Sequence, residues 1–244
     1  MNNVWDSLAK IHYSRLSNGE DTTFHKIFLP VIVDNIQRQT GFNSYSILDV
    51  GCGTGYLTGL ISTYARTVLG VDSSKASIDI AIKHNNETKN VDFKCEDIKV
   101  LPGSRQQVFD FAISHLVLHV VEDLDNTLRS ISACLKADSR FLFSIPHPCF
   151  WALSRDVGTW NFKRINKYKY DKPSVQQNSI NIGGNEFVTP YFHRPIEFYF
   201  TALEKRGFAI ERIIEPFPDK KLLQENHKKN WRFPRFMFMM CIKH

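Results

Sequence analysis

A short apolar run that ends in alternating glycines constrains this chain more than any other feature of its sequence. The run Ser46-Ile47-Leu48-Asp49-Val50 leads directly into Gly51-Cys52-Gly53-Thr54-Gly55, and a helical segment over residues 56–64 follows. An apolar run of this length that ends in glycines is typical of a buried parallel strand. Glycines between such a strand and a helix let a ligand approach the backbone closely. The pattern therefore predicts an α/β fold with a ligand site after this strand.

Strands and helices continue to alternate through residues 47–145. Four further strands are expected after the first, at residues 67–71, 91–95, 109–114 and 140–145. Helices are expected from Ser73 or Ser74 to about Asn85, and over residues 124–135. A helix at 196–205 and strands at 208–214 and 235–242 complete the pattern. Such alternation implies a doubly wound, Rossmann-like and mostly parallel seven-stranded sheet with right-handed crossovers.

Regularity breaks between residues 146 and 195, where aromatic residues are dense and no helix is evident. The Gly-Gly pair in Ile182-Gly183-Gly184-Asn185 favours a hairpin turn. This insertion follows the fifth strand at its carboxyl end, which is the side on which such sheets bind ligands. Two helices are expected before the first strand, over residues 4–16 and 23–37, either packed on the sheet or folded over its binding edge.

Composition excludes several classes of protein. No apolar stretch approaches the roughly 18 residues that a membrane span needs, and the N-terminus does not resemble a signal peptide. The five scattered cysteines include no Cys-x-x-Cys pair, which argues against a disulfide framework and against zinc and favours a cytoplasmic location. The net charge of +6 permits an anionic partner without requiring one, because Lys and Arg are spread along the chain.

The acidic residues around the glycines indicate which ligand is bound. Asp72 ends the second strand, 21 residues after Gly51, where a carboxylate can accept both hydroxyls of a ribose. The dinucleotide fingerprint would need a third glycine at position 56, which is Tyr56. Asp49 also lies two residues before the first glycine, where it suits an ammonium group and would repel a pyrophosphate. The pattern therefore disfavours NAD and FAD.

These motifs resemble the class I S-adenosylmethionine-dependent methyltransferases. The run 48–55 matches the Asp-x-Gly-x-Gly-x-Gly form of their first motif, and Val71-Asp72 resembles their second. Glu96-Asp97-Ile98 resembles the third, whose acid meets the adenine amino group, and residues 109–114 resemble the fourth-strand motif. The resemblance implies an antiparallel last strand and S-adenosylmethionine as cofactor. It implies the following cofactor-binding residues: Asp49, Gly51, Cys52, Gly53, Gly55, Asp72, Ser73, Asp97, Ile98, Ser114 and His115.

Each acid also has a purely structural alternative. Asp49 and Asp72 would then only cap the helices that follow them, and Asp97 would lie in a plain surface turn. Three acids at the ends of three successive strands, all on the ligand side, favour the cofactor interpretation.

The expected acceptor side is less specific. Residues 144–150 and 189–195 resemble segments of bacterial small-molecule methyltransferases, in which an irregular stretch covers the acceptor pocket. Tyr13, His119, Trp160 and Tyr191 are the candidate substrate-binding residues, although each aromatic residue in the insertion could equally form the core of a small hairpin. His147 and His193, at the two ends of the insertion, are the candidate general bases, since imidazole titrates near neutral pH. The alternative for His147 is a hydrogen bond to the lid backbone.

We therefore expect a single methyltransferase domain, with a helical cap at 1–40, a cofactor-binding core at 46–145, a lid at 146–194 and the rest of the core at 195–244. The expected reaction moves a methyl group to an oxygen, nitrogen or carbon atom of a small-molecule acceptor. RNA or protein methylation, and a cofactor-binding protein without catalysis, remain the alternatives. No metal is expected, nucleic acid and membranes are not favoured as partners, and the sequence does not define the oligomeric state.

Overall fold

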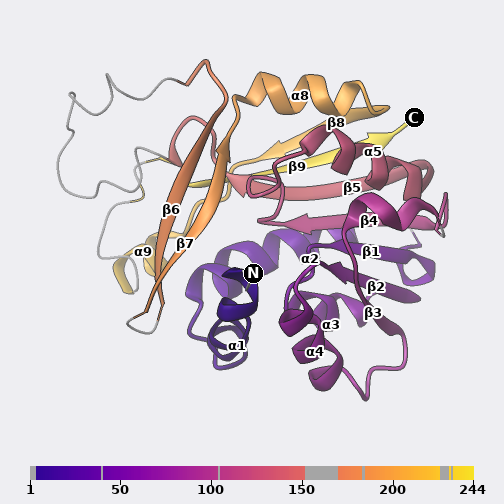
Figure 1. The fold of residues 1–244 in the computed structure, drawn as a ribbon, viewed down its shortest axis with the longest axis horizontal. Helices are drawn as coiled ribbons and strands as arrows, with labels where there is room; N and C mark the ends of the chain where they lie inside the picture. The colour runs from indigo at the N-terminus through magenta and orange to yellow at the C-terminus, as the bar shows by residue number, and fades with distance from the viewer. Residues whose placement is uncertain are drawn as a thin grey trace.

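A seven-stranded sheet with helices on both faces forms the centre of the molecule (Figure 1). The computed structural model describes residues 4–39, 41–103, 105–151, 170–182, 185–225, 231 and 233–244. Within them the strand order is β3-β2-β1-β4-β5-β9-β8. The strands are β1 (Ser46–Val50), β2 (Thr67–Asp72), β3 (Val91–Cys95), β4 (Phe109–His115), β5 (Leu135–Pro146), β8 (Phe208–Ile214) and β9 (Phe236–Lys243).

The last strand is antiparallel to both of its neighbours, β5 and β8, whereas β1 to β5 pair in parallel. The predicted doubly wound, mostly parallel sheet with an antiparallel last strand is thereby confirmed. Every residue of β1 is buried, as expected of a central parallel strand. The strand order reverses between β1 and β4, and in open α/β sheets this switch point is where ligands bind.

Two hydrophobic layers hold the helices against the sheet. Leu128 of α5 (Leu124–Cys134) and Leu203 of α8 (Ile196–Glu204) belong to the layer that also contains Phe143 of β5. Ile61 of α3 (Tyr56–Ser62) lies in the opposite layer, together with Phe238 of β9. The chain also forms α4 (Lys75–His84), α9 (Lys220–Glu225), and the short helices η2 (Phe42–Ser44) and η3 (Ile98–Gly103). The alternation of β5 and β9 side chains between the two layers gives both faces an apolar core.

The N-terminal segment consists of α1 (Val4–Ser17), η1 (Phe24–Phe28) and α2 (Leu29–Gln37). The sequence predicted one helix over residues 23–37, but its first part is a π-helix that continues directly into α2. Pro30 lies in the first turn of α2, where its missing N–H removes one helical hydrogen bond. A wider helical turn just before this proline is consistent with that loss. Helix α1 packs on α4 and also contacts β7.

A long antiparallel hairpin stands beside the sheet (Figure 1). It consists of β6 (Ser174–Ile182) and β7 (Asn185–His193), which form a separate two-stranded sheet. Ile182 pairs with Asn185, so the strands change direction where the sequence indicated a turn. The insertion is therefore more regular in this part than the sequence suggested, and its function as a lid stays a prediction. None of the described helices has the length and apolar character needed to cross a membrane.

Candidate cofactor and acceptor site

The glycine loop after β1 uses its three glycines for three different reasons. Gly51, Gly53 and Gly55 all have positive φ angles, of 71°, 54° and 71°, which strain any residue with a side chain. A Cβ atom at Gly51 would lie 2.4 Å from Val117, and one at Gly55 would lie 2.7 Å from both Ala81 and Phe93. A Cβ atom at Gly53 would meet nothing within 4 Å. Gly53 therefore faces open space, whereas the outer two glycines are needed for close packing.

Asp72, at the end of β2, is fixed beside this open position. One carboxylate oxygen accepts a hydrogen bond from the Gly53 N–H at 2.9 Å, and the other accepts one from the Ser74 N–H at 2.8 Å. Burial raises the pKa of Asp72, although these backbone hydrogen bonds oppose that rise. Ser74 in turn caps α4 by accepting a hydrogen bond from the Ser77 N–H, and it is one of the two cap residues, Ser73 and Ser74, that the sequence offered. The carboxylate is thus oriented from two sides before any ligand arrives.

Asp49 is the most deeply buried acid of the loop, with a relative exposure of 1%. Its side chain accepts a hydrogen bond of 2.7 Å from the Thr58 hydroxyl of α3. Burial raises its pKa to about 7, with the Thr58 hydrogen bond acting in the opposite direction and the nearby charge of Asp72 adding to the rise. The Asp49 carboxyl therefore lies near its midpoint of ionisation at neutral pH, and a neighbouring cation would favour its charged form.

The remaining predicted cofactor residues lie along the same edge of the sheet. Asp97 follows β3 with its side chain 49% exposed, and it accepts a hydrogen bond from the Lys99 N–H. Ile98 packs against the hydrophobic layer that contains Leu128 and Phe143. Ser73 is exposed after β2, whereas Cys52 is buried in the glycine loop.

Ser114 and His115 end β4, next to the glycine loop. The Ser114 hydroxyl donates to the Val50 carbonyl at 3.1 Å, which ties β4 to β1. The His115 Nδ1 atom lies 2.7 Å from the Ser144 hydroxyl, whose oxygen already accepts a hydrogen bond from the Leu116 N–H. Burial lowers the pKa of His115 to about 3, and the neighbouring His12 of α1 adds to that effect. His115 is therefore a neutral ring at physiological pH.

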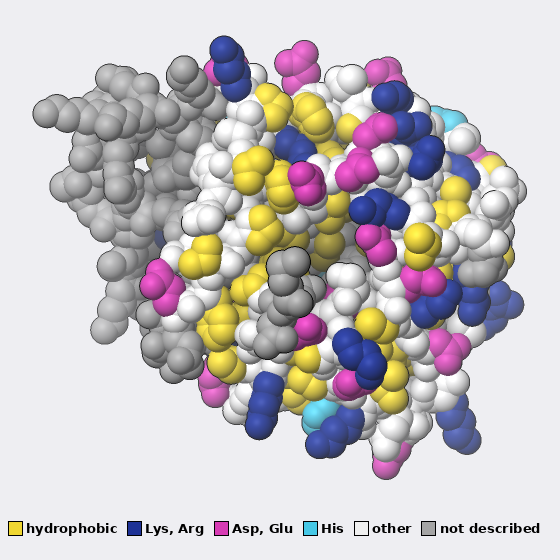
Figure 2. Space-filling model, in the orientation of Figure 1, with side chains coloured by type: hydrophobic (Ala, Val, Ile, Leu, Met, Phe, Trp, Pro, Cys, Tyr) yellow, Lys and Arg dark blue, Asp and Glu magenta, His cyan; other side chains and the backbone are white. Residues whose placement is uncertain are grey.

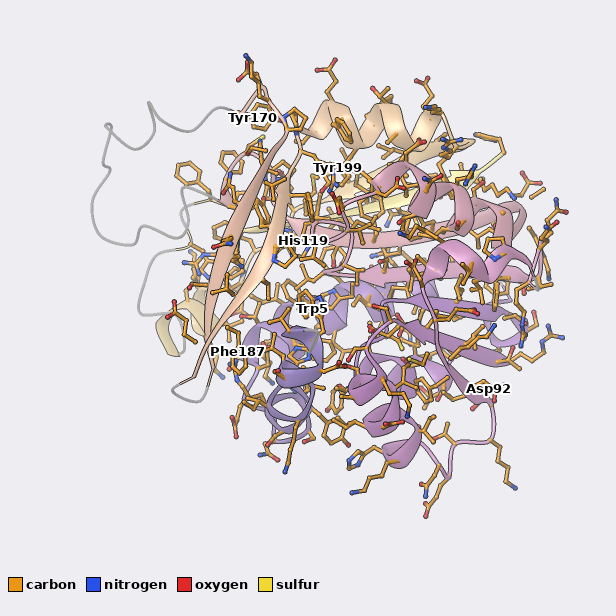
Figure 3. All side chains as sticks on the ribbon, in the orientation of Figure 1. Trp5, Asp92, His119, Tyr170, Phe187 and Tyr199 are labelled. Carbon is orange, nitrogen blue, oxygen red and sulfur yellow. The ribbon has the colours of Figure 1, made fainter. Side chains whose placement is uncertain are left out.

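On the acceptor side, the structure brings His119 and Tyr191 together. Their rings lie 5.8 Å apart, and the Phe192 N–H of β7 donates to the His119 carbonyl at 2.8 Å. Figure 3 places His119 between the end of the sheet and Trp5 of α1 in this view. Figure 2 shows hydrophobic side chains gathered around a hollow near the middle of the same face.

Arg194 holds the turn that carries His119. Its guanidinium donates to the carbonyls of Leu118, Val121 and Glu122, at 3.2, 2.6 and 2.8 Å. Arg194 is only 6% exposed. Sequence reasoning missed this residue, because nothing in its local pattern indicates a contact with a turn more than 70 positions earlier.

Tyr13 lies on another side of the cap. It stacks on His84 of α4 at 4.1 Å and contacts Tyr56 edge-on at 6.3 Å. It therefore packs on α3 and α4, and no described ring contact brings it to Tyr191. Trp160, the other predicted substrate-binding residue, lies outside the described residues.

His147 and His193 are both nearly fully buried, and both make hydrogen bonds that fix their rings. The Nδ1 atom of His147 accepts from the Cys149 N–H at 3.2 Å, so its Nε2–H donates to Glu215 at 2.6 Å. The Nε2–H of His193 donates to the Tyr170 carbonyl at 3.0 Å. For His147 both ring nitrogens are thereby used, and this geometry favours the structural alternative over the role of general base. Within the described chain, no group of three or more His, Cys, Asp or Glu residues could hold a metal ion.

The strand order and the glycine loop together define the class of protein. They give the doubly wound α/β fold of the class I S-adenosylmethionine-dependent methyltransferases. The family model described as a methyltransferase domain matches residues 42–181, and the chain belongs to this family.

Curated relatives and solved structures agree with this classification. The chain is 31% identical over 116 residues to a ubiquinone biosynthesis O-methyltransferase of Coxiella burnetii, covering 47% of this chain and 49% of that one. It is 29% identical over 140 residues to a malonyl-[acyl-carrier protein] O-methyltransferase of Bacillus anthracis, covering 57% and 49%. The chain thus spans about half the length of the curated relatives it matches. An S-adenosylmethionine-dependent methyltransferase structure from Clostridium acetobutylicum has the same fold, with a TM-score of 0.66, 18% identity and 99% coverage of both chains.

Proposed function

We propose that this protein binds S-adenosylmethionine and transfers its methyl group to a small-molecule acceptor. The observation that carries the proposal is the open space at Gly53 beside the oriented carboxylate of Asp72. A side chain at position 53 would fill that space, and a carboxylate at this point suits the two hydroxyls of a ribose. Membership of the methyltransferase-domain family supports the same interpretation.

The surrounding residues fit the other parts of the cofactor. Asp97 is exposed at the edge of the sheet and can accept a hydrogen bond from the adenine amino group, with Ile98 against the ring. Asp49, whose pKa of about 7 permits ionisation at neutral pH, can pair with the ammonium group of the methionine part. The backbone at Ser114 and His115 would border that part on the side of β4.

Bound S-adenosylmethionine supplies an electrophilic methyl group on a sulfonium centre. The chain's own residues then have to align the acceptor and exclude water. The turn that carries His119 is held by Arg194, which gives the acceptor side a fixed wall. The β6–β7 hairpin contacts this turn through the Phe192 N–H, and α1 contacts β7, so the two elements would close the wall from outside.

Oxygen is the acceptor atom that the comparisons favour. Both curated relatives described above are named as O-methyltransferases. Their named acceptors differ, and the similarity covers only part of each chain, so the proposal extends to a hydroxyl or carboxyl acceptor but to no particular compound.

Calorimetry with S-adenosylhomocysteine tests cofactor binding directly. Asp72→Ala should weaken the affinity by at least about 1.5–3 kcal/mol, the value of one charge-assisted hydrogen bond, because the hydrogen bonds to the ribose are lost. Asp92→Ala is the matched control, since Asp92 lies exposed on the neighbouring edge strand β3 (Figure 3). Equal affinities of Asp72→Ala and the parent protein would contradict the assignment of the ribose site.

A second experiment separates small molecules from RNA. Lys and Arg are interspersed with Asp and Glu on the face in Figure 2, which does not favour a polyanion there. Binding to RNA would fall steeply with salt because of counterion release. A filter assay with total RNA at low and moderate salt, combined with labelled methyl groups, measures both binding and transfer. Salt-sensitive RNA binding with methyl incorporation would replace the small-molecule proposal.

A further inference from the structure

One arginine at the ligand edge of the sheet carries a charge that no described residue compensates. Arg235 immediately precedes β9, and its carbonyl accepts a hydrogen bond of 2.8 Å from the His147 N–H, just beyond the carboxyl end of β5. Pro146, the last residue of β5, pairs with Phe236. Because such sheets bind ligands at the carboxyl ends of their strands, Arg235 lies on the side of the sheet where the acceptor is expected.

The Arg235 side chain has no carboxylate partner among the described residues. Its Nε atom is buried without a hydrogen bond. Burial lowers the pKa of Arg235, and within the described chain no carboxylate opposes that effect. The acid that reaches the same strand end, Glu215, is bound instead to the His147 ring at 2.6 Å. Since the Arg235 side chain as a whole is partly exposed, it is an accessible cation without a counterion.

An aromatic ring accounts for one face of this cation and leaves its donors unused. The Arg235 Cζ atom lies 4.8 Å from the centre of the Trp231 ring. Such a contact is electrostatically favourable, but it does not occupy the N–H groups along the edge of the guanidinium. The planar fork that these groups form matches the geometry of a carboxylate or a phosphate. The chemistry of Arg235 therefore points to an anionic group on the ligand.

A single unpaired cation favours a carboxylate over a phosphate. A phosphate monoester carries a charge of about −1.5 to −2 near neutral pH, so one arginine would neutralise only part of it. Among the described groups that influence the pKa of Arg235, none is a second cation. A carboxylate carries one negative charge, and its two oxygens can each accept an N–H of the fork. The surroundings of Arg235 therefore match a carboxylate in both charge and shape.

A row of aromatic side chains joins Arg235 to the cofactor side of the site. The Phe28 ring of η1 lies 4.8 Å from the His115 ring at the end of β4 and 4.6 Å from the Phe236 ring at the start of β9. Phe236 lies 6.0 Å from Trp231, on which Arg235 stacks. Of these rings, His115 and Phe236 are partly exposed. A short surface lined by uncharged rings therefore leads from the end of β4 to the cation.

We propose that Arg235 binds a carboxylate of the acceptor, and that a ring-sized apolar body joins this carboxylate to the methyl-accepting atom near His115. This inference rests on the proposed function and adds the substrate class to it, a small aromatic carboxylic acid. The carboxylate at Arg235 anchors the acceptor and does not itself receive the methyl group, because the row of rings separates it from the end of β4. Arg235 would thereby fix which atom of the acceptor faces the cofactor.

Binding of simple aromatic probes to the protein saturated with S-adenosylhomocysteine tests this proposal. Benzoate, benzamide and phenyl phosphate share one ring and differ in charge, and calorimetry measures the affinity of each. We expect benzoate to bind roughly tenfold more tightly than benzamide, the effect of one charge-assisted pair. If benzoate binds no more tightly than benzamide, including the case in which neither binds, the proposal is wrong. Tighter binding of phenyl phosphate than of benzoate would overturn the assignment to a carboxylate.

Substitutions at Arg235 identify the group responsible. Arg235→Gln removes the charge and should abolish the preference for benzoate over benzamide. Arg235→Lys keeps the charge without the planar fork and should retain part of the preference. Arg140→Gln is the matched control, because Arg140 pairs with Ile242 near the opposite end of β9 and its side chain binds Glu211 there. A preference for benzoate that survives in Arg235→Gln would refute the role of Arg235.

Binding of S-adenosylhomocysteine separates this proposal from the proposed function. If the parent protein binds S-adenosylhomocysteine but does not prefer benzoate, the role of Arg235 is refuted and the proposed function stands. If S-adenosylhomocysteine does not bind to the parent protein, the proposed function fails first and the role of Arg235 fails with it. Arg235→Gln and Arg235→Lys should both bind S-adenosylhomocysteine as the parent does, which shows that the variants are folded.

Discussion

Asp6, in the first turn of α1, accepts a hydrogen bond of 2.6 Å from the hydroxyl of Ser74, the residue that caps α4. It accepts a second one, of 3.2 Å, from the Ala76 N–H. The Ser74 N–H is bound to Asp72, and Asp72 is bound to Gly53. The N-terminal helix is thus linked through three consecutive contacts to the loop proposed to hold the cofactor. Sequence analysis did not single out Asp6, although an acid in a first helical turn is a recognisable feature.

Asp6→Ala should weaken binding of S-adenosylhomocysteine, because Ser74 and Asp72 lose a fixed neighbour. We expect a fewfold to tenfold loss of affinity, corresponding to about one hydrogen bond. Limited proteolysis should also cut α1 faster, and saturating ligand should restore less protection than in the parent protein. Asp79→Ala is the control. Asp79 lies on α4, where its described interaction is an exposed ion pair with Lys75 of the same helix. If both variants behave alike, α1 is not coupled to the cofactor loop.

Gly53→Ala should abolish cofactor binding without unfolding the protein. The positive φ angle makes any side chain there cost about 1–2 kcal/mol, but no atom clashes with the added Cβ. Gly19→Ala is a closely matched control, because Gly19 also has a positive φ angle of 72° and open space around it. Thermal melts should show similar losses for the two variants, while calorimetry should find binding only in Gly19→Ala. Retained binding by Gly53→Ala would mean that the ligand does not pass this position.

The sequence predicted the fold well where the signal is local. Residues 208–214 form β8 as expected, and α4 is capped by Ser74, one of the two residues that the sequence offered. Apolar runs and capping residues are both recognised within a few residues of sequence. The π-helical segment at Phe24–Phe28 was missed because apolar spacing does not separate it from an α-helix. Strand β6 was missed because its sequence is polar and it has only β7 as a partner, so no buried face imposes an alternating pattern.

The sequence predicted those site residues that come directly after a parallel strand. The glycine loop and Asp72 lie together because parallel strands bring their carboxyl ends to one edge. The hydrogen bonds of His147 could not be foreseen, since Glu215 lies 68 residues away. Arg194 was missed for the same reason, because its three carbonyl partners belong to a distant turn.

Asp49 should give the ligand-free protein a pH-dependent stability. Its folded pKa of about 7 lies above the ordinary 3.8, so the folded state binds the extra proton between these values. The free energy of unfolding should therefore fall as the pH rises from about 4 to about 7. Asp49→Asn keeps an acceptor for the Thr58 hydroxyl and removes the ionisation. At pH 8 it should be roughly 2–4 kcal/mol more stable than the parent protein, and it should bind S-adenosylhomocysteine more weakly.

Denaturant unfolding across this pH range measures the effect. Thr58→Val should shift the fall in stability to higher pH, because the Thr58 hydrogen bond is what lowers the pKa of Asp49. Identical pH profiles for the parent protein and Asp49→Asn would show that Asp49 does not titrate in this range.

His147→Ala should reduce stability more than it reduces catalysis. The variant loses the hydrogen bond to Glu215 and leaves the Cys149 N–H without its partner, which together should lower the free energy of unfolding by about 1–3 kcal/mol. Glu215→Ala should reproduce part of this loss, since it removes the same contact from the other side. Affinity for S-adenosylhomocysteine should stay within about twofold in both variants. The opposite result, a roughly 10²–10⁴-fold drop in turnover with normal stability, is what a general base would give. It would mean that the ring leaves Glu215 during the reaction, and that His147 acts on the acceptor after all.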